Sequence, residues 1–149
     1  MRIAVAGIGY VGLANAVLLA QHNDVVAVDV VQERVDDLNR RVSPLHDKEI
    51  QKYLRENELH LMATADGAFA YKGADFIVIA TPTNYDPDKN FFDTSSIEMI
   101  LGLIKEVNPA AAVFIKSTVP VGYTKSVREE YGMERIIFSP KFLREGRAR

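Results

Sequence analysis

The stretch that decides the fold is residues 3–12, IAVAGIGYVG. A short apolar run, Ile3–Ala6, leads directly into three glycines with the spacing G-x-G-x-x-G, and an Ala- and Leu-rich segment follows. In a strand-turn-helix unit Gly7 allows the tight turn, Gly9 lets the backbone approach a pyrophosphate, and Gly12 lets the helix pack closely on the sheet. The helix N-terminus then offers N–H groups to the anion. The stretch therefore predicts a dinucleotide site at the end of the first strand.

The residue that selects between dinucleotides is Asp29, at the end of the second apolar run. It lies 17 residues after Gly12, close to the spacing of about 20 that is typical of the acidic residue in this unit. A carboxylate there accepts hydrogen bonds from the ribose hydroxyls and repels a 2′-phosphate, so the sequence favours NAD over NADP. Arg34 has two interpretations: it lies beside the adenosine ribose, or it is a solvated charge on a helix.

Alternating strand-like and helix-like segments set the fold class. Apolar, β-branched runs predict strands buried on both faces. The predicted strands are Ile3–Ala6, Val25–Val30, Leu59–Ala63, Phe76–Ala80, Ala112–Ile115 and Ile136–Phe138. The predicted helices are Val11–Gln21, Val31–Asn39, Asp47–Glu56 and one that begins with a capping box at Ser95 and Glu98 and ends at Asn108-Pro109. This alternation predicts an α/β fold of the Rossmann type, doubly wound, with a mainly parallel sheet and helices on both faces.

Composition excludes several classes of function. The 149 residues carry 18 Lys+Arg against 20 Asp+Glu, a balance that argues against binding to nucleic acid or to an anionic membrane. The chain has no cysteine, and therefore no disulfide, no thiolate zinc site and no Cys nucleophile. Its three histidines match no metal-ligand spacing, so no metal site is predicted. We expect a cytoplasmic protein, because no apolar stretch approaches the length of a membrane span and no cleavable signal is present.

Further clusters follow predicted strands, at the edge where ligands of such folds bind. They are Thr81-Pro82-Thr83-Asn84, Lys116–Gly122 and Ser139–Gly146. Hydroxyl groups in the first two can meet ribose or phosphate oxygens, although a plain turn and a helix cap explain the same residues. Pro120 keeps its predecessor extended, which should hold Ser117 and Thr118 near the nicotinamide end of a bound dinucleotide. Asp86-Pro87-Asp88 lacks the Gly and Glu of a calcium loop and is interpreted as a turn.

Four segments together resemble the NAD-binding part of the UDP-glucose/GDP-mannose dehydrogenase family, over essentially the whole chain. They are GIGYVGL (7–13), ATPTNYD (80–86), IKSTVPVG (115–122) and FSPKFLREG (138–146). The last three are more diagnostic than the glycine pattern, which many nucleotide-binding folds share. The resemblance implies that two NAD oxidise the C6 hydroxyl of UDP-glucose to a carboxylate through a cysteine-bound intermediate. It also implies a parent enzyme that is a homodimer.

The resemblance implies roles for single residues as well. Those expected to bind the cofactor are Gly7, Gly9, Tyr10, Val11, Gly12, Asp29, Arg34, Thr83, Thr118 and Glu145. Thr118 would also position water, and Glu145 would contact the cofactor near the reacting centre, so both are candidates for catalysis. The candidates for substrate binding are Lys141, Phe142, Leu143 and Arg144.

Two departures from the family pattern limit what this chain can do alone. Lys141 stands where the family has a glutamate that acts as acid and base in thioester hydrolysis, and a lysine keeps its proton at neutral pH. The family's catalytic cysteine and lysine, its dimer-forming helix and its sugar-nucleotide half lie beyond residue 149. We therefore expect one NAD-binding domain over residues 1–149, incomplete for catalysis. Two alternatives stay open: a stand-alone NAD-sensing module, and the same domain of a dehydrogenase for GDP-mannose or a UDP-hexosamine.

Overall fold

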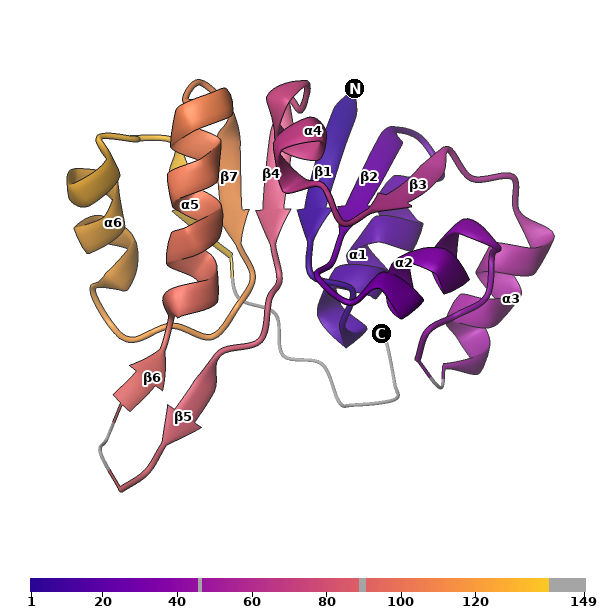
Figure 1. Cartoon of the computed structure of the whole chain (residues 1–149), viewed down its shortest axis with the longest axis horizontal. Coiled ribbons are helices and arrows are strands. Elements are labelled where there is room, and N and C mark those ends of the chain that lie inside the picture. The colour runs from indigo at the N-terminus through magenta and orange to yellow at the C-terminus, as the bar shows by residue number, and fades with distance from the viewer. Residues whose placement is uncertain (46, 89–90, 140–149) are drawn as a thin grey trace.

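A six-stranded, all-parallel sheet forms the centre of the molecule (Figure 1). The computed structural model describes residues 1–45, 47–88 and 91–139. In spatial order the strands of this sheet are β3 (Leu61–Thr64), β2 (Asp24–Val28), β1 (Arg2–Ala6), β4 (Phe76–Ile79), β7 (Ala112–Ile115) and β8 (Ile136–Phe138). All six correspond to strands predicted from the sequence.

Helices cover both faces of the sheet. On one face lie α1 (Tyr10–Leu19), α2 (Gln32–Asn39) and α3 (Lys48–Glu56), and on the other lie α4 (Gly67–Lys72), α5 (Ser95–Val107) and α6 (Tyr123–Tyr131). Along β1 the side chains alternate: Ile3 and Val5 pack against the first layer of helices, Ala4 and Ala6 against the second. Because both faces are buried, the strands read as continuous apolar runs in the sequence. The predicted doubly wound α/β fold is confirmed.

The order of the strands creates a crevice at the carboxyl edge of the sheet. β1 pairs with β2 on one side and with β4 on the other, and Ala6 is in register with both Val28 and Ile79. The three strands therefore end level, and the loops that follow them meet at one edge. In a doubly wound sheet this is the point where the crossovers diverge in opposite directions and leave room for a ligand.

Most predicted bounds differ from the structure by no more than one or two residues. The second strand ends at Val28 and not at Val30, because the carboxylate of Asp29 accepts backbone N–H groups from Ile8 and Val31 and turns the chain out of the sheet. The strand predicted over Leu59–Ala63 starts two residues later, at Leu61, where pairing with β2 begins.

The capping box predicted at the start of α5 was wrong by one residue. Thr94 is the N-cap, and its hydroxyl donates to the Glu98 carboxylate. Ser95 is the first helical residue, and its N–H and hydroxyl both donate to Asp93. The apolar face of α5 packs into the core, where three of its residues are completely buried: Ile97, Leu101 and Ile104.

Four elements were given no bounds by the sequence, and one of them is α6 (Tyr123–Tyr131). β5 (Asn84–Asp86) and β6 (Phe91–Asp93) form an antiparallel hairpin that extends away from the body of the domain in Figure 1. Residues 87–88 form a turn there, as interpreted from the sequence. The last of the four, α4, has six residues, too few for a helical period to show in the sequence.

Candidate dinucleotide site

The loop between β1 and α1 needs two of its glycines for its own shape. Gly7 has a φ of +101°, and a Cβ placed on it would lie 2.9 Å from the carbonyl oxygen of Ala80. A Cβ on Gly12 would lie 1.8 Å from the carbonyl oxygen of Gly7. A Cβ on Gly9 would have no atom of the described chain within 4 Å. Gly7 and Gly12 are therefore required by the folded chain, whereas Gly9 borders open space that a ligand can occupy.

The N-terminus of α1 faces this open space without a capping side chain. Gly9 is the N-cap, and in the described part of the chain no side chain accepts a hydrogen bond there and no acid lies in the first turn. The N–H groups of the first helical turn, residues 10–12, are thus available to an anion. Together with the gap at Gly9, they fit a pyrophosphate.

Asp29 is held rigidly next to this loop. Its Oδ2 accepts the N–H of Ile8 at 2.8 Å, and its Oδ1 accepts the N–H of Val31 at 2.9 Å. Arg34 lies on the solvent side, with Nη1 3.6 Å from Asp29 Oδ2, and its side chain is 41% exposed where that of Asp29 is 8% exposed. Each carboxylate oxygen keeps a second lone pair, so the group can still accept ribose hydroxyls.

A cleft of about 360 Å³ opens at the carboxyl ends of β1, β2 and β4. Gly7, Gly9, Asp29 and Arg34 line one part of it. The remaining lining is mainly apolar and comes from the β2–α2 corner, from Pro82 and from α5; it includes Val30, Val31, Met99 and Ile100. Val30 is 94% exposed and Met99 is 77% exposed. Large apolar side chains exposed at the rim of a cleft are typical of a surface that a ligand covers.

The hydroxyl residues predicted at the other strand ends are tied together by hydrogen bonds. Thr83 Oγ1 donates to the carbonyl oxygen of Thr118 at 2.6 Å. Ser117, which is buried, donates through Oγ to the carbonyl oxygen of Thr81 at 2.6 Å. The loops after β4 and β7 are therefore held against each other. Thr81 and Pro82 line the cleft, so this pair of loops continues the site along the sheet edge.

The structure thus brings most of the predicted cofactor residues to one edge. Gly7, Gly9, Asp29 and Arg34 line the cleft, Tyr10, Val11 and Gly12 form the adjoining first turn of α1, and Thr83 and Thr118 lie along the same edge. The remaining predicted residues lie outside the described part of the chain: Lys141, Phe142, Leu143, Arg144 and Glu145.

Sequence reasoning missed the part of the cleft that α4 and α5 provide. Tyr71, Ser96, Met99 and Ile100 all line it. One signal for α4 was present: Asp66 precedes an Ala-containing segment, and its carboxylate caps the helix by accepting the N–H of Phe69 at 3.2 Å.

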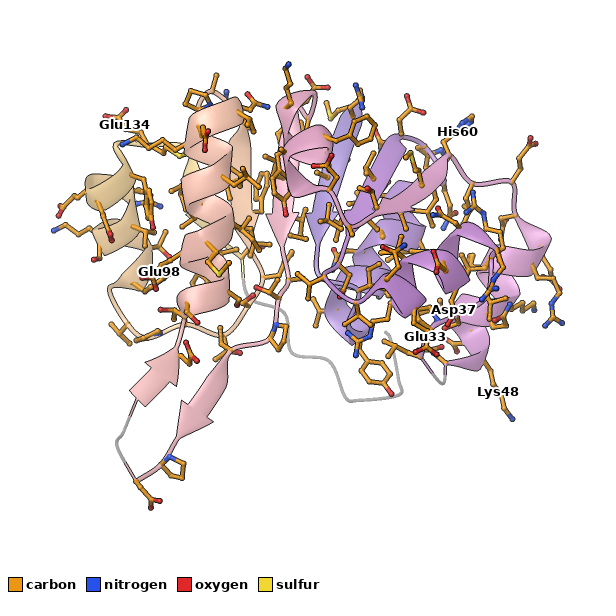
Figure 2. All side chains as sticks on the ribbon, viewed as in Figure 1. Glu33, Asp37, Lys48, His60, Glu98 and Glu134 are labelled. Atoms are coloured by element: carbon orange, nitrogen blue, oxygen red, sulfur yellow. The ribbon has the colours of Figure 1, made fainter. Side chains whose placement is uncertain are left out.

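Ionisable groups away from the cleft have structural surroundings. Figure 2 shows Glu98 on the side of α5 that faces α6, where it accepts the hydroxyl of Tyr123 at 3.3 Å. Burial, with a smaller contribution from the Glu98 carboxylate, raises the pKa of Tyr123 to about 12.

The described residues contain no group of three or more His, Cys, Asp or Glu that could hold a metal ion. None of the described helices combines the length and apolarity needed to cross a bilayer.

Comparison with known families decides which dinucleotide-binding proteins this fold is related to. Residues 1–149 match the sequence model of the NAD binding domain of UDP-glucose/GDP-mannose dehydrogenases. The chain belongs to the UDP-glucose/GDP-mannose dehydrogenase family. NAD is the cofactor of that domain, and the glycine loop, the free N-terminus of α1 and Asp29 fit it. The predicted family and cofactor are confirmed.

Two relatives in the UDP-glucose/GDP-mannose dehydrogenase family show high identity. The UDP-glucose 6-dehydrogenase of Streptococcus pneumoniae is 54% identical over 148 residues, which is 99% of this chain and 38% of the relative. The UDP-glucose 6-dehydrogenase of Campylobacter jejuni is 50% identical over 150 residues, which again is 99% of this chain and 38% of the relative. The structure of a UDP-D-ManNAc dehydrogenase from Pyrococcus horikoshii matches with a TM-score of 0.85 at 29% identity, over 98% of this chain and 37% of that one. This chain spans less than two fifths of the length of these relatives.

Proposed function

We propose that this chain is the NAD-binding domain, residues 1–149, of an enzyme that oxidises the C6 hydroxyl of UDP-glucose to a carboxylate. The observation that carries the proposal is the identity of 54% and 50% to two UDP-glucose 6-dehydrogenases over nearly the whole chain. These two relatives favour UDP-glucose as the nucleotide sugar. The overall reaction consumes one water and removes two hydrides, each of which passes to one NAD.

The residues at the cleft bind and orient the dinucleotide. The N–H groups of the first turn of α1 hold the pyrophosphate, and Gly9 admits it because no side chain fills that space. Asp29 accepts the adenosine ribose hydroxyls and repels a 2′-phosphate. Arg34 stays within 3.6 Å of Asp29 and borders the same ribose. Fixing the cofactor in this way places its reactive ring at a constant distance from the sugar, which lowers the entropic part of the barrier.

The other strand ends serve the reacting end of the cofactor. Thr83 and Thr118, joined by a hydrogen bond of 2.6 Å, border the nicotinamide half, and the Thr118 hydroxyl orients the water used in the second oxidation. By resemblance to the family, Glu145 contacts the cofactor near the reacting centre. Residues 141–144 contact the substrate.

The chain requires the rest of the enzyme for turnover. It has no cysteine, whereas the family reaction passes through a cysteine-bound intermediate, and its relatives are more than twice as long. Lys141 occupies the position of a family glutamate, and a lysine is a poor proton acceptor at neutral pH. The proposal is therefore a cofactor-binding half of a homodimeric enzyme, without activity on its own.

Calorimetric titration of the 149-residue chain with NAD and with NADP tests the cofactor site. We expect saturable NAD binding and at least tenfold weaker binding of NADP, because the Asp29 carboxylate repels the 2′-phosphate. Asp29→Ala should weaken NAD binding and reduce the ratio of NAD affinity to NADP affinity. Asp24→Ala is the matched control, since Asp24 lies at the opposite end of β2 with its side chain 68% exposed. Equal binding of both dinucleotides, or of neither, would overturn the cofactor assignment.

A chimera tests the reaction. The chain is joined to the remaining part of the Streptococcus pneumoniae relative, and NADH is counted per nucleotide sugar consumed. We expect two NADH per UDP-glucose from the chimera and none from the 149-residue chain alone. Lys141→Glu in the chimera should speed formation of the acid. A chimera that binds NAD but oxidises UDP-D-ManNAc in place of UDP-glucose would refute the substrate, and turnover by the chain alone would refute its incompleteness.

A further inference from the structure

Tyr71 is a buried tyrosine whose ring runs toward the carboxyl edge of the sheet. It lies in the last turn of α4 and is 2% exposed. A Cβ built on Gly67, at the start of the same helix, would lie 3.0 Å from Tyr71 Cε2 and 3.5 Å from Cζ, the carbon that carries the hydroxyl. Helical side chains lean toward the N-terminus of their helix, and α4 starts at the carboxyl edge. The hydroxyl is therefore directed to the edge where the cleft opens.

The Tyr71 hydroxyl accepts and donates no hydrogen bond within residues 1–45, 47–88 and 91–139. Burying a hydroxyl without a partner costs free energy, so native proteins rarely leave one unpaired. In the described chain the one fully enclosed side-chain polar atom that lacks a partner is Asp47 Oδ2. The Tyr71 hydroxyl thus keeps an opening, and the cleft is the cavity that Tyr71 lines. Burial raises the pKa of the phenol, so it stays protonated and can both donate and accept.

The surroundings of Tyr71 in the cleft suit a flat heteroaromatic ring. Val30 and Val31 form one wall, and Pro82, Met99 and Ile100 contribute the apolar surface on the side of β4 and α5. Asp29 lies at one end of this space and fixes where the adenosine ribose binds. A mainly apolar slot with a few hydrogen-bonding groups is the usual form of a site that orients a planar ligand. The ring attached to that ribose is adenine. Of the other polar side chains that line the cleft, Ser96 donates to Thr81 and Arg34 lies against Asp29, which leaves the Tyr71 hydroxyl for the base.

We propose that the Tyr71 hydroxyl forms a hydrogen bond with the edge of the adenine ring of NAD and so determines which base the cleft accepts. This inference rests on the NAD binding proposed above. It assigns to Tyr71 two effects. Without ligand the hydroxyl adds no hydrogen bond that stabilises the domain, and with ligand it strengthens binding. A tyrosine that served only the core would show no loss of NAD affinity on removal of the hydroxyl and no dependence on the base.

Tyr71→Phe separates these effects, because it removes the hydroxyl and keeps the ring. We expect the variant to melt at the same temperature as the parent chain or higher in the absence of ligand, and to bind NAD and ADP about tenfold more weakly by calorimetry. Tyr123→Phe is the matched control. It removes another tyrosine hydroxyl, one that donates to Glu98 on the far side of α5, and it should leave NAD affinity unchanged.

Analogues of ADP identify the contact on the base. Each lacks one hydrogen-bonding atom: N1, N3, N7 or the 6-amino group. One of them should bind the parent chain about tenfold more weakly than ADP does, yet bind Tyr71→Phe as well as ADP does. Unchanged NAD affinity in Tyr71→Phe, or an equal loss for every analogue, would overturn the role of Tyr71. A parent chain that binds no NAD would instead overturn the proposed function.

Discussion

Alanine at Gly9 and alanine at Gly12 should have opposite consequences, although the two glycines belong to one loop. Gly9 has an extended backbone, with φ −91° and ψ −168°, which alanine also adopts. Its Cβ would meet nothing within 4 Å in the free domain. At Gly12 the Cβ would lie 1.8 Å from the carbonyl oxygen of Gly7. Gly9→Ala should therefore impair ligand binding alone, and Gly12→Ala should impair folding.

The structure sets the size of each effect. The atom that would clash with a Cβ at Gly12 belongs to the backbone, so no side chain can rotate away to relieve the clash. Gly12→Ala should therefore lower the free energy of unfolding by about 3 kcal/mol, the upper end for overpacking. For a domain of this size that lowers the melting temperature by roughly 6–12 °C. For Gly9→Ala, the weaker N-cap and the smaller entropy of the unfolded chain nearly offset, so stability should stay within about 0.5 kcal/mol. Its methyl group fills the space of the pyrophosphate, so NAD affinity should fall at least tenfold, about 1.4 kcal/mol.

Two measurements on each variant are sufficient: thermal unfolding without ligand, and calorimetric titration with NAD. Gly102→Ala serves as the control, because Gly102 lies in α5 with nothing within 4 Å of its Cβ. The result that would refute the reasoning is a Gly9→Ala variant that binds NAD like the parent chain. A Gly12→Ala variant with unchanged melting temperature would equally contradict the close packing described for the loop.

Three further outcomes are expected. Gly102→Ala should raise stability by about 0.5–1 kcal/mol in urea unfolding, because alanine is the better helix former; a loss would show that α5 needs its glycine. Asp47 caps α3 through Oδ1, which accepts the N–H groups of Glu49 and Ile50, while its Oδ2 is buried without a partner in the described residues. Asp47→Ser should therefore match the parent in urea midpoint, and Asp47→Ala should lose about 1 kcal/mol. Since the pKa of Tyr123 is about 12 in the folded chain against 10.0 ordinarily, its contribution to stability is complete below pH 10 and disappears as the pH rises through 12. The urea midpoint should therefore fall less in Tyr123→Phe than in the parent between pH 9 and pH 11.5.

The sheet was predictable because its strands are buried on both faces. Each such strand appears as a short apolar run, and each crossover helix separates two runs, so the order of elements follows from local sequence. The same logic fails for the β5–β6 hairpin, whose strands have three residues each, and for α4. These elements are too short for a period of 2 or 3.6 to appear, and their positions depend on contacts with the rest of the fold.

The candidate site divides in the same way. The glycine loop and Asp29 were predictable because backbone geometry forces their residue types, and these types occur at a fixed spacing. Tyr71 and Met99 reach the cleft from α4 and α5, tens of residues away, and nothing in their local sequence marks them as ligand contacts. The error at Ser95 has a related cause: both Thr94 and Ser95 are residue types found at helix N-caps, and the local sequence does not show that Thr94 takes this position while Ser95 bonds to Asp93.

The bond between Asp29 and Ile8 connects the two halves of cofactor recognition. Ile8 is fully buried, and its N–H donates to Asp29 Oδ2 at 2.8 Å. A substitution that merely removes the carboxylate therefore also leaves a buried donor unpaired inside the glycine loop, at a cost of about 1–3 kcal/mol. Asp29→Asn keeps an acceptor for Ile8 and removes the charge that repels a 2′-phosphate, whereas Asp29→Ala removes the charge but leaves the N–H of Ile8 without its acceptor. Asp29→Asn should consequently shift the preference toward NADP while the glycine loop keeps its shape. Asp29→Ala should weaken the binding of both dinucleotides.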